Sequence, residues 1–182
     1  MKPFQSAKFQ AAPLLIFAAL TACVSAAPSE NVLPDRVQVS WAPSDQLSEV
    51  RDNPAMRGPY RQPEDWQRML SAHLRKRADA MLPPGEHLDV TIDNIKLAGD
   101  YEPWRGPNLQ DVRIMKDVYP PRIDLHYRLL AADGTTIRDG KDKMLDMAYL
   151  QQTLPVTSDP LRYDKRLIDE WLRKEFGPPR GS

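Results

Sequence analysis

Acidic side chains in the middle of the chain are the residues whose chemistry is easiest to name. They are Asp89, Asp93, Asp100, Glu102 and Asp111. Two carboxylates held close together can act as the acid and the base or nucleophile of a hydrolase, and the pair that we consider is Asp100 and Glu102. Alternate strand positions that face water explain Asp89 and Asp93 equally well. A hydrolase that uses carboxylates near Asp100 and Glu102 is therefore an alternative interpretation.

Other catalytic patterns do not occur in the sequence. The three histidines, His73, His87 and His126, lack a metal-ligand spacing such as His-x-x-x-His. There is no Gly-x-Ser-x-Gly elbow, phosphate loop or dinucleotide fingerprint. Cys23 is the only cysteine, which excludes zinc and iron–sulfur sites built from several cysteines. We predict no catalytic residue, no metal site and no cofactor, and an enzyme is the less favoured interpretation.

The segment Asp100–Pro121 has the composition of a binding loop. It joins two predicted strands through more than twenty residues, whereas hairpin loops usually have ~2–5. Four prolines stiffen it, and a stiff aromatic loop loses little entropy on binding. Trp, Tyr and Arg are also the residue types that dominate interface hot spots. The candidate partner-binding residues are Tyr101, Glu102, Trp104, Arg105 and Tyr119.

The alternative for this segment is structural. Trp104 would fold back over the core, with Leu109, Val112 and Ile114 anchoring the loop. Large aromatic side chains are usually mostly buried, which favours this alternative. The sequence alone leaves both open.

The start of the chain has the parts of a bacterial secretory signal. Lys2 and Lys8 precede an apolar stretch at residues 11–22. Its 12 residues are too few for a bilayer span, which needs ~20. Cys23 follows in the order Leu-Thr-Ala-Cys, which resembles the lipobox of bacterial lipoproteins, so we expect a lipid on its thiolate. Cleavage after Ala26 is the alternative and would give a soluble periplasmic protein.

These features predict the organisation of the chain and its location. The expected parts are a lipoprotein signal peptide at residues 1–22, a flexible tether at 23–36, a single globular domain at 37–177 and a disordered tail at 178–182. Removal of the signal leaves 160 residues, enough for one domain that buries ~70% of its unfolded surface. The expected place is the periplasmic face of a bacterial envelope membrane. The lipid would contact the membrane, and an envelope protein is the candidate partner.

Charge argues against nucleic acid as a partner. The chain has 25 basic and 25 acidic residues, so its formal net charge is zero. A nucleic-acid-binding protein usually carries a basic surplus on one face. The longest run of like charge is Arg75-Lys76-Arg77, which a solvated helix face explains.

Apolar periodicity predicts the first elements that carry these segments. Val37, Val39 and Trp41 alternate with polar residues and indicate a first strand. A polar connection from Pro43 to Pro63 follows. The next helix has one apolar face, made of Trp66, Met69, Leu70, Leu74, Ala78 and Met81.

The second strand, at residues 88–97, contains a change of phase. Its apolar residues are Leu88, Val90, Ile92, Ile95 and Leu97. The last two have the opposite parity from the first three, so a straight strand would place them on opposite faces. One extra residue near Asp93 and Asn94 restores a common face, and we predict a β-bulge there.

A hairpin follows the loop. Residues 123–129 indicate a third strand, and Asp133-Gly134 supplies its turn. The returning strand at 135–145 is rich in charge, which protects an exposed sheet edge.

The last helix has clear ends. Ser158 or Asp159 is the expected N-cap, with Pro160 at the first helical position and Gly177 after the end. Trp171 lies on its apolar face and should be buried.

The order strand, helix, strand, strand, strand, helix predicts the fold class. Two amphipathic helices and a sheet each need a partner for their apolar faces, and stacking both helices on one sheet face satisfies all three. We predict an α/β (α+β) two-layer sandwich, with about four mostly antiparallel strands and two helices on one face.

Two runs of the sequence also resemble a known family. They are LAGDYEPWRGPNLQDVRIMKDVYPPRIDLHYRL and, near the C-terminus, SDPLRYDKRLIDEWLRKEF. They are similar to the bacterial envelope family called domain of unknown function 3016, over residues 37–176. The resemblance implies an exported protein of envelope type, and it brings no catalytic residue, ligand or cofactor.

Overall fold

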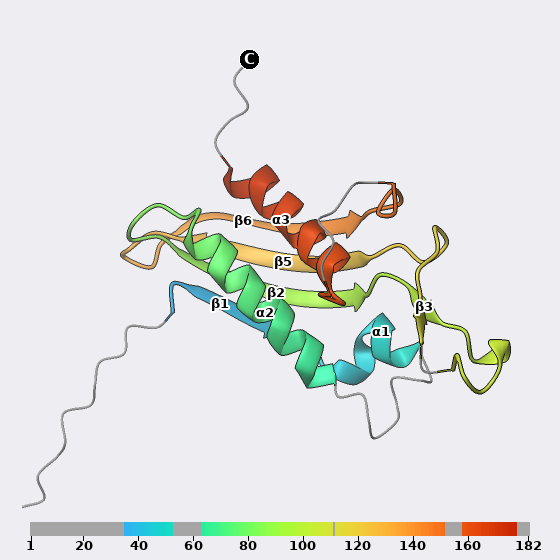
Figure 1. Cartoon of the computed structure of the whole chain (residues 1–182). Helices are drawn as coiled ribbons and strands as arrows, with labels where there is room; N and C mark the ends of the chain where they lie inside the picture. Colours follow the sequence, from blue (N-terminus) through green and yellow to red (C-terminus); the bar gives the residue numbers. More distant parts are fainter. Residues whose placement is uncertain (1–34, 53–62, 111, 152–157, 178–182) are drawn as a thin grey trace, which may run out of the picture. The chain divides into compact units, whose positions relative to one another are not determined.

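The computed structural model describes residues 35–52, 63–110, 112–151 and 158–177. In this part of the chain, four strands form one sheet: β1 (Val37–Trp41), β2 (His87–Lys96), β5 (Arg122–Leu130) and β6 (Thr136–Leu145). Two long helices, α2 (Pro63–Asp79) and α3 (Arg162–Phe176), cover one face of the sheet (Figure 1). The smaller elements are η1 (Ser44–Gln46), α1 (Ser48–Arg51), β3 (Asp100–Tyr101), η3 (Pro103–Arg105) and β4 (Arg113–Ile114). The predicted two-layer α+β sandwich is confirmed.

Several predictions fall outside the described residues. These are the signal peptide, Cys23, all of the tether before residue 35, Asp111 and the tail at 178–182. They remain predictions.

The sheet has the strand order β1-β2-β5-β6. β1 and β2 are parallel, whereas β2, β5 and β6 pair antiparallel. Parallel neighbours need a crossover connection, and α2 lies within the connection between β1 and β2. The sheet is therefore mostly antiparallel, as predicted, with a βα crossover at one edge.

The β-bulge predicted in β2 is confirmed. The register with β5 shifts between Ile92 and Asn94. As a result Ile92 and Ile95 both face the core, with 2% and 0% of their surface exposed. The Asn94 side-chain oxygen accepts a 2.8 Å hydrogen bond from the Ser48 amide, so the bulge also fixes the start of α1.

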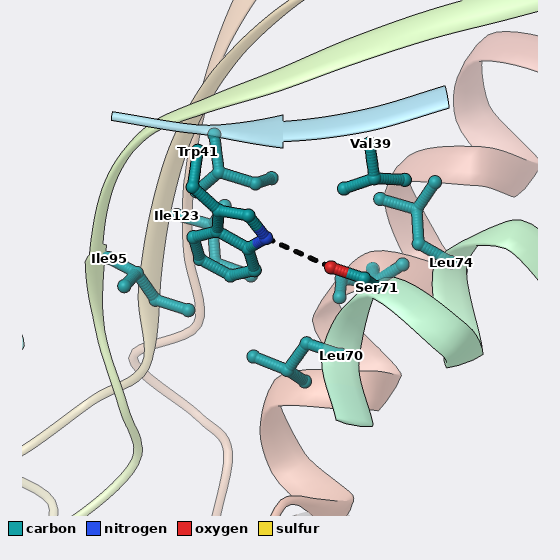
Figure 2. Close-up of a pocket in the computed structure, with 9 residues that line it drawn as sticks. Val39, Trp41, Leu70, Ser71, Leu74, Ile95 and Ile123 are labelled. Carbon is teal, nitrogen blue, oxygen red and sulfur yellow. Dashed lines mark hydrogen bonds between the residues drawn. The ribbon is translucent and has the colours of Figure 1, made fainter. Parts of the chain in front are cut away.

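The core lies between the sheet and the two helices. Figure 2 shows its β1 edge, where the Trp41 indole nitrogen donates a 2.9 Å hydrogen bond to the Ser71 hydroxyl of α2. Leu70 of α2 and Ile123 of β5 line the same region. There is no space for a water molecule here, so this part of the interior is filled by side chains, as protein interiors generally are.

Aromatic side chains join α3 to the other half of the sheet. Trp171 is 2% exposed, as predicted. Its ring meets those of Tyr127 and Phe176 edge to face, with centroid separations of 5.6 and 5.7 Å. Its indole nitrogen donates a 3.0 Å hydrogen bond to Asp142 of β6. Trp171 therefore connects α3 to both β5 and β6.

Three local predictions were wrong. Met69 is 40% exposed, because the buried stripe of α2 runs mainly at a spacing of four through Trp66, Leu70 and Leu74. The last helix begins at Arg162, two residues after Pro160, because Asp159 accepts a hydrogen bond from the Leu161 amide in a turn ahead of it.

The third error concerns the connection after Pro43. It contains η1 and α1, and Leu47 and Glu49 are both 0% exposed. Residues 47–49 are thus part of the core at the end of the sheet where β2 stops, and that end carries the candidate site.

Candidate functional site

The predicted loop has secondary structure of its own. β3 and β4 pair antiparallel, and the Gly99 amide donates a 2.9 Å hydrogen bond to the Tyr119 carbonyl. Gly99 has a φ of +78°, and a Cβ there would lie 2.8 Å from the Ile114 carbonyl oxygen. Only glycine fits this position. The chain between β2 and β5 is therefore built as a closed loop on a short ladder.

Glu102 is the centre of this loop. Its side chain is buried, and one carboxylate oxygen accepts hydrogen bonds from the Lys116 ammonium and, at 2.9 Å, from the Tyr119 hydroxyl. The Arg105 guanidinium lies 2.7 Å from the other oxygen. The hydrogen bond from Lys116 lowers the pKa of Glu102, and the bond to Glu102 raises the pKa of Tyr119. Glu102 is thus an ionised structural hub that draws both halves of the loop together.

Trp104 lies on the outside of this hub. It is 72% exposed in the short helix η3, which follows Glu102 directly. The alternative in which Trp104 covers the core is therefore wrong, and Val112, which would have anchored such a lid, is 44% exposed. Lys116, Tyr119 and Arg105 hold the loop through Glu102, and Trp104 lies outside these contacts. The loop presents Trp104 to solvent from a fixed base.

The other predicted site residues have structural roles. Tyr101 is half-buried in β3, and the Arg113 guanidinium lies 4.7 Å from the centre of its ring. Asp100 pairs with Lys96 at 3.2 Å. Of the five candidate binding residues, the structure brings Glu102, Arg105 and Tyr119 into direct contact. Trp104 projects beside them, and Tyr101 belongs to the ladder beneath.

Buried charges lie under the ladder. Glu49 of α1 is 0% exposed, and its carboxylate forms an ion pair with Arg113 of β4. Glu49 also accepts a 3.0 Å hydrogen bond from the Leu97 amide. Arg113 in turn donates to the carbonyls of Ala98 and Gly99, at 3.2 and 3.1 Å. The chain that leaves β2 is therefore held from both sides by a buried ion pair.

A second buried carboxylate reaches the same turn from α3. Asp164 is 1% exposed, and one of its oxygens accepts a 3.0 Å hydrogen bond from the Ala98 amide. Its other oxygen is buried without a partner among the described residues. Burial raises the pKa of Asp164 to about 7, although the hydrogen bond from the Ala98 amide and the charge of Arg113 act against this rise; the charge of Glu49 adds to it.

Exposed apolar side chains gather at the same end of the sheet. Seven large ones are exposed among the described residues: three belong to the loop, one is the last residue of β6, and one lies in the segment after β6. These five are Trp104, Val112, Val118, Leu145 and Met147. Hydrogen bonds join the two segments, from the Asp146 amide to the Pro121 carbonyl at 3.3 Å and from the Tyr149 hydroxyl to the Lys116 carbonyl at 2.8 Å. Among the described residues, exposed apolar side chains are therefore more frequent at this end of the sheet than elsewhere.

The histidines do not join this site. His73 of α2 pairs with Asp169 of α3 at 2.9 Å, and His126 pairs with Asp93 on the uncovered sheet face at 2.8 Å. Among the described residues, no group of three or more His, Cys, Asp or Glu side chains could hold a metal ion. Within the same ranges, no helix is both long and apolar enough to cross a bilayer.

The sequence prediction missed Glu49, Arg113 and Asp164, the charged side chains beneath the ladder. Asp164 could have been found, because it lies three residues after Leu161 and three before Leu167 on the apolar face of α3. Glu49 and Arg113 gave no such signal, since their partners lie 48 and 64 residues away.

The chain was compared with protein families, curated proteins and solved structures. No curated protein matches it, and no solved structure does. The family model described as "Protein of unknown function (DUF3016)" matches residues 35–174. This range includes every strand of the sheet, the loop with Glu102 and Trp104, and nearly all of α3. The chain belongs to the DUF3016 family.

Proposed function

We propose that this protein is an exported, lipid-anchored protein of the bacterial envelope. In this proposal it acts on the periplasmic face of a membrane as a non-catalytic binding or assembly accessory. Cys23, after its basic and apolar leader, supports the lipid anchor. The loop around Trp104 supports the binding role, with another envelope protein as partner.

The observation that carries the binding role is an exposed tryptophan on a fixed loop. Trp104 is 72% exposed, while Glu102 directly before it is held by Lys116, Tyr119 and Arg105. Such a side chain offers a large contact area, and it loses less entropy on binding when the neighbouring residue is already held in place. Val118 and Met147, 72% and 61% exposed, are further exposed apolar side chains at this end of the sheet.

The loop lies far from residue 35, where the described part of the chain begins. Residue 35 enters the sheet at the start of β1, which aligns with the start of β2. The loop follows the other end of β2, ten residues further along, or roughly 30 Å at the usual strand rise. The first described residue and the loop are therefore at opposite ends of the β1–β2 pair.

The hydrolase alternative has less support. A general acid needs a raised pKa, whereas the pKa of Glu102 is lowered by its hydrogen bond from Lys116. Asp164 does have a raised pKa, but its side chain is 1% exposed and no substrate could reach it. We therefore give the binding role precedence.

Replacing Trp104 with alanine is expected to abolish partner capture. Hot-spot tryptophans contribute ~2 kcal/mol or more to binding, so the captured amount should fall at least about tenfold. The free energy of unfolding should change by less than ~0.5 kcal/mol, because the side chain is exposed. Affinity purification from envelope membranes and urea unfolding measure the two effects.

Met69→Ala is the matched control for this experiment. Met69 is also an exposed apolar side chain, but it lies on α2. Capture that survives Trp104→Ala, or that is lost equally in Met69→Ala, would show that the loop is not the binding surface.

Replacing Cys23 with serine is expected to release the protein from membranes. Serine lacks the thiolate that receives the lipid, and a lipoprotein stays on the membrane through more than one acyl chain. Membrane fractionation and the intact mass of the natural protein check this. A natural N-terminus at Ala27 without lipid would contradict the anchor, while leaving the loop proposal in place.

A further inference from the structure

The turn that connects β2 to the loop is held by charged side chains from three elements. Asp164 of α3 accepts a hydrogen bond from the Ala98 amide, and Glu49 of α1 accepts one from the Leu97 amide. Arg113 of β4 donates to the Ala98 and Gly99 carbonyls. Because Gly99 pairs with Tyr119 at the far end of the loop, these contacts fix both ends of the loop at one place.

We propose that Asp164 is a proton-operated latch, which holds the base of the loop closed when it is protonated and loosens it when it is ionised. The latch belongs to the base of the loop, so it does not depend on whether the loop binds a partner. The latch makes the order of the loop base depend on pH, and it assigns this dependence to the side chain of Asp164.

The charges around Asp164 show why its ionisation is costly in the closed state. Glu49 and Arg113 face it from α1 and β4, and Tyr149 faces it from the segment after β6. Glu49 pairs with Arg113 and also with Lys96 of β2, and the Lys96 ammonium pairs with Asp100 as well. These two carboxylates and two cations are neutral as a whole. An ionised Asp164 therefore adds one uncompensated negative charge, with one oxygen that has no described partner. A buried charge of this kind is costly.

The direction of the pH effect follows from burial. Burial raises the pKa of Asp164 from 3.8 to about 7, so the closed state holds its proton up to near neutral pH. In an open state water reaches the carboxylate, and the proton leaves at a lower pH. The closed state is therefore favoured in mild acid, and this advantage is lost as the pH rises towards and through 7.

Hydrogen exchange of backbone amides tests the latch directly. From pH 5.5 to pH 8, after correction for intrinsic exchange, the protection of the Ala98 and Gly99 amides should fall roughly thirtyfold in the natural protein. In Asp164→Asn the change should be less than about threefold, because asparagine imitates the protonated acid. Glu64→Gln is the matched control, since it removes an exposed carboxylate in the first turn of α2. It should behave like the natural protein.

Two results would overturn the proposal. One is the same pH dependence of protection in Asp164→Asn as in the natural protein. The other needs no variant: NMR titration of carbon-13-labelled aspartate carboxyl groups should place Asp164 near pH 7. A midpoint below about 5, close to its ordinary value, would remove the basis of the latch whether or not the variant folds.

Discussion

Replacing Glu49 with glutamine is expected to lower the free energy of unfolding by about 3–5 kcal/mol, the usual cost of breaking a buried ion pair. Glu49 is 0% exposed and is the counter-charge of Arg113 beneath the loop. The substitution removes the counter-charge of the mostly buried Arg113 guanidinium. Glu49 accepts one hydrogen bond on each carboxylate oxygen, from Arg113 and from the Leu97 amide. Glutamine has only one side-chain oxygen, so one of these two donors would face an NH₂ group. Urea unfolding at constant pH measures the loss.

Two further variants make this result specific. Glu64→Gln, at an exposed carboxylate, should change the free energy of unfolding by less than ~0.5 kcal/mol. The double variant Glu49→Leu with Arg113→Met should lose less than the sum of the two single losses, because no charge is then left unpaired. A loss below ~1 kcal/mol for Glu49→Gln would show that the ion pair does not hold the loop base.

Replacing Trp171 with alanine is also expected to cost about 3–5 kcal/mol, as for other buried aromatic side chains. The variant loses the edge-to-face contacts with Tyr127 and Phe176 and the hydrogen bond to Asp142. It also leaves a cavity between α3 and the sheet. Urea unfolding measures this effect, and Trp104→Ala serves as the comparison, because the same substitution at a 72% exposed position should cost little. A small loss at Trp171 would place α3 outside the core.

Much of the fold could be predicted because its signals are local. The bulge in β2 is the clearest case, since a change of apolar parity near Asp93 and Asn94 was enough to locate it. The edge position of β6 followed from its charges in the same way. The beginning of α3 was misplaced by two residues, because Asp159 caps a turn in place of the helix itself.

The candidate site could be predicted only in part. The length and composition of the loop drew attention to Trp104 and Glu102. They did not show that Glu102 is buried and holds the loop, whereas Trp104 is exposed. Glu102 is bound by side chains 3 to 17 residues away, which fix the loop and leave Trp104 outside. The layer beneath was not predicted, because Glu49 and Asp164 meet the end of β2 across 48 and 66 residues of sequence. Such contacts depend on how the elements pack, which periodicity does not report.

The central claim is that the fixed loop around Trp104 is the surface that meets a partner. Site-specific photo-crosslinking in cells tests it most directly, with a photoreactive residue at position 104 in one strain and at position 69, also on the surface but on α2, in another. The account predicts one envelope protein crosslinked from position 104 and absent from position 69. Equal crosslinking from both positions, or none from position 104, would contradict it.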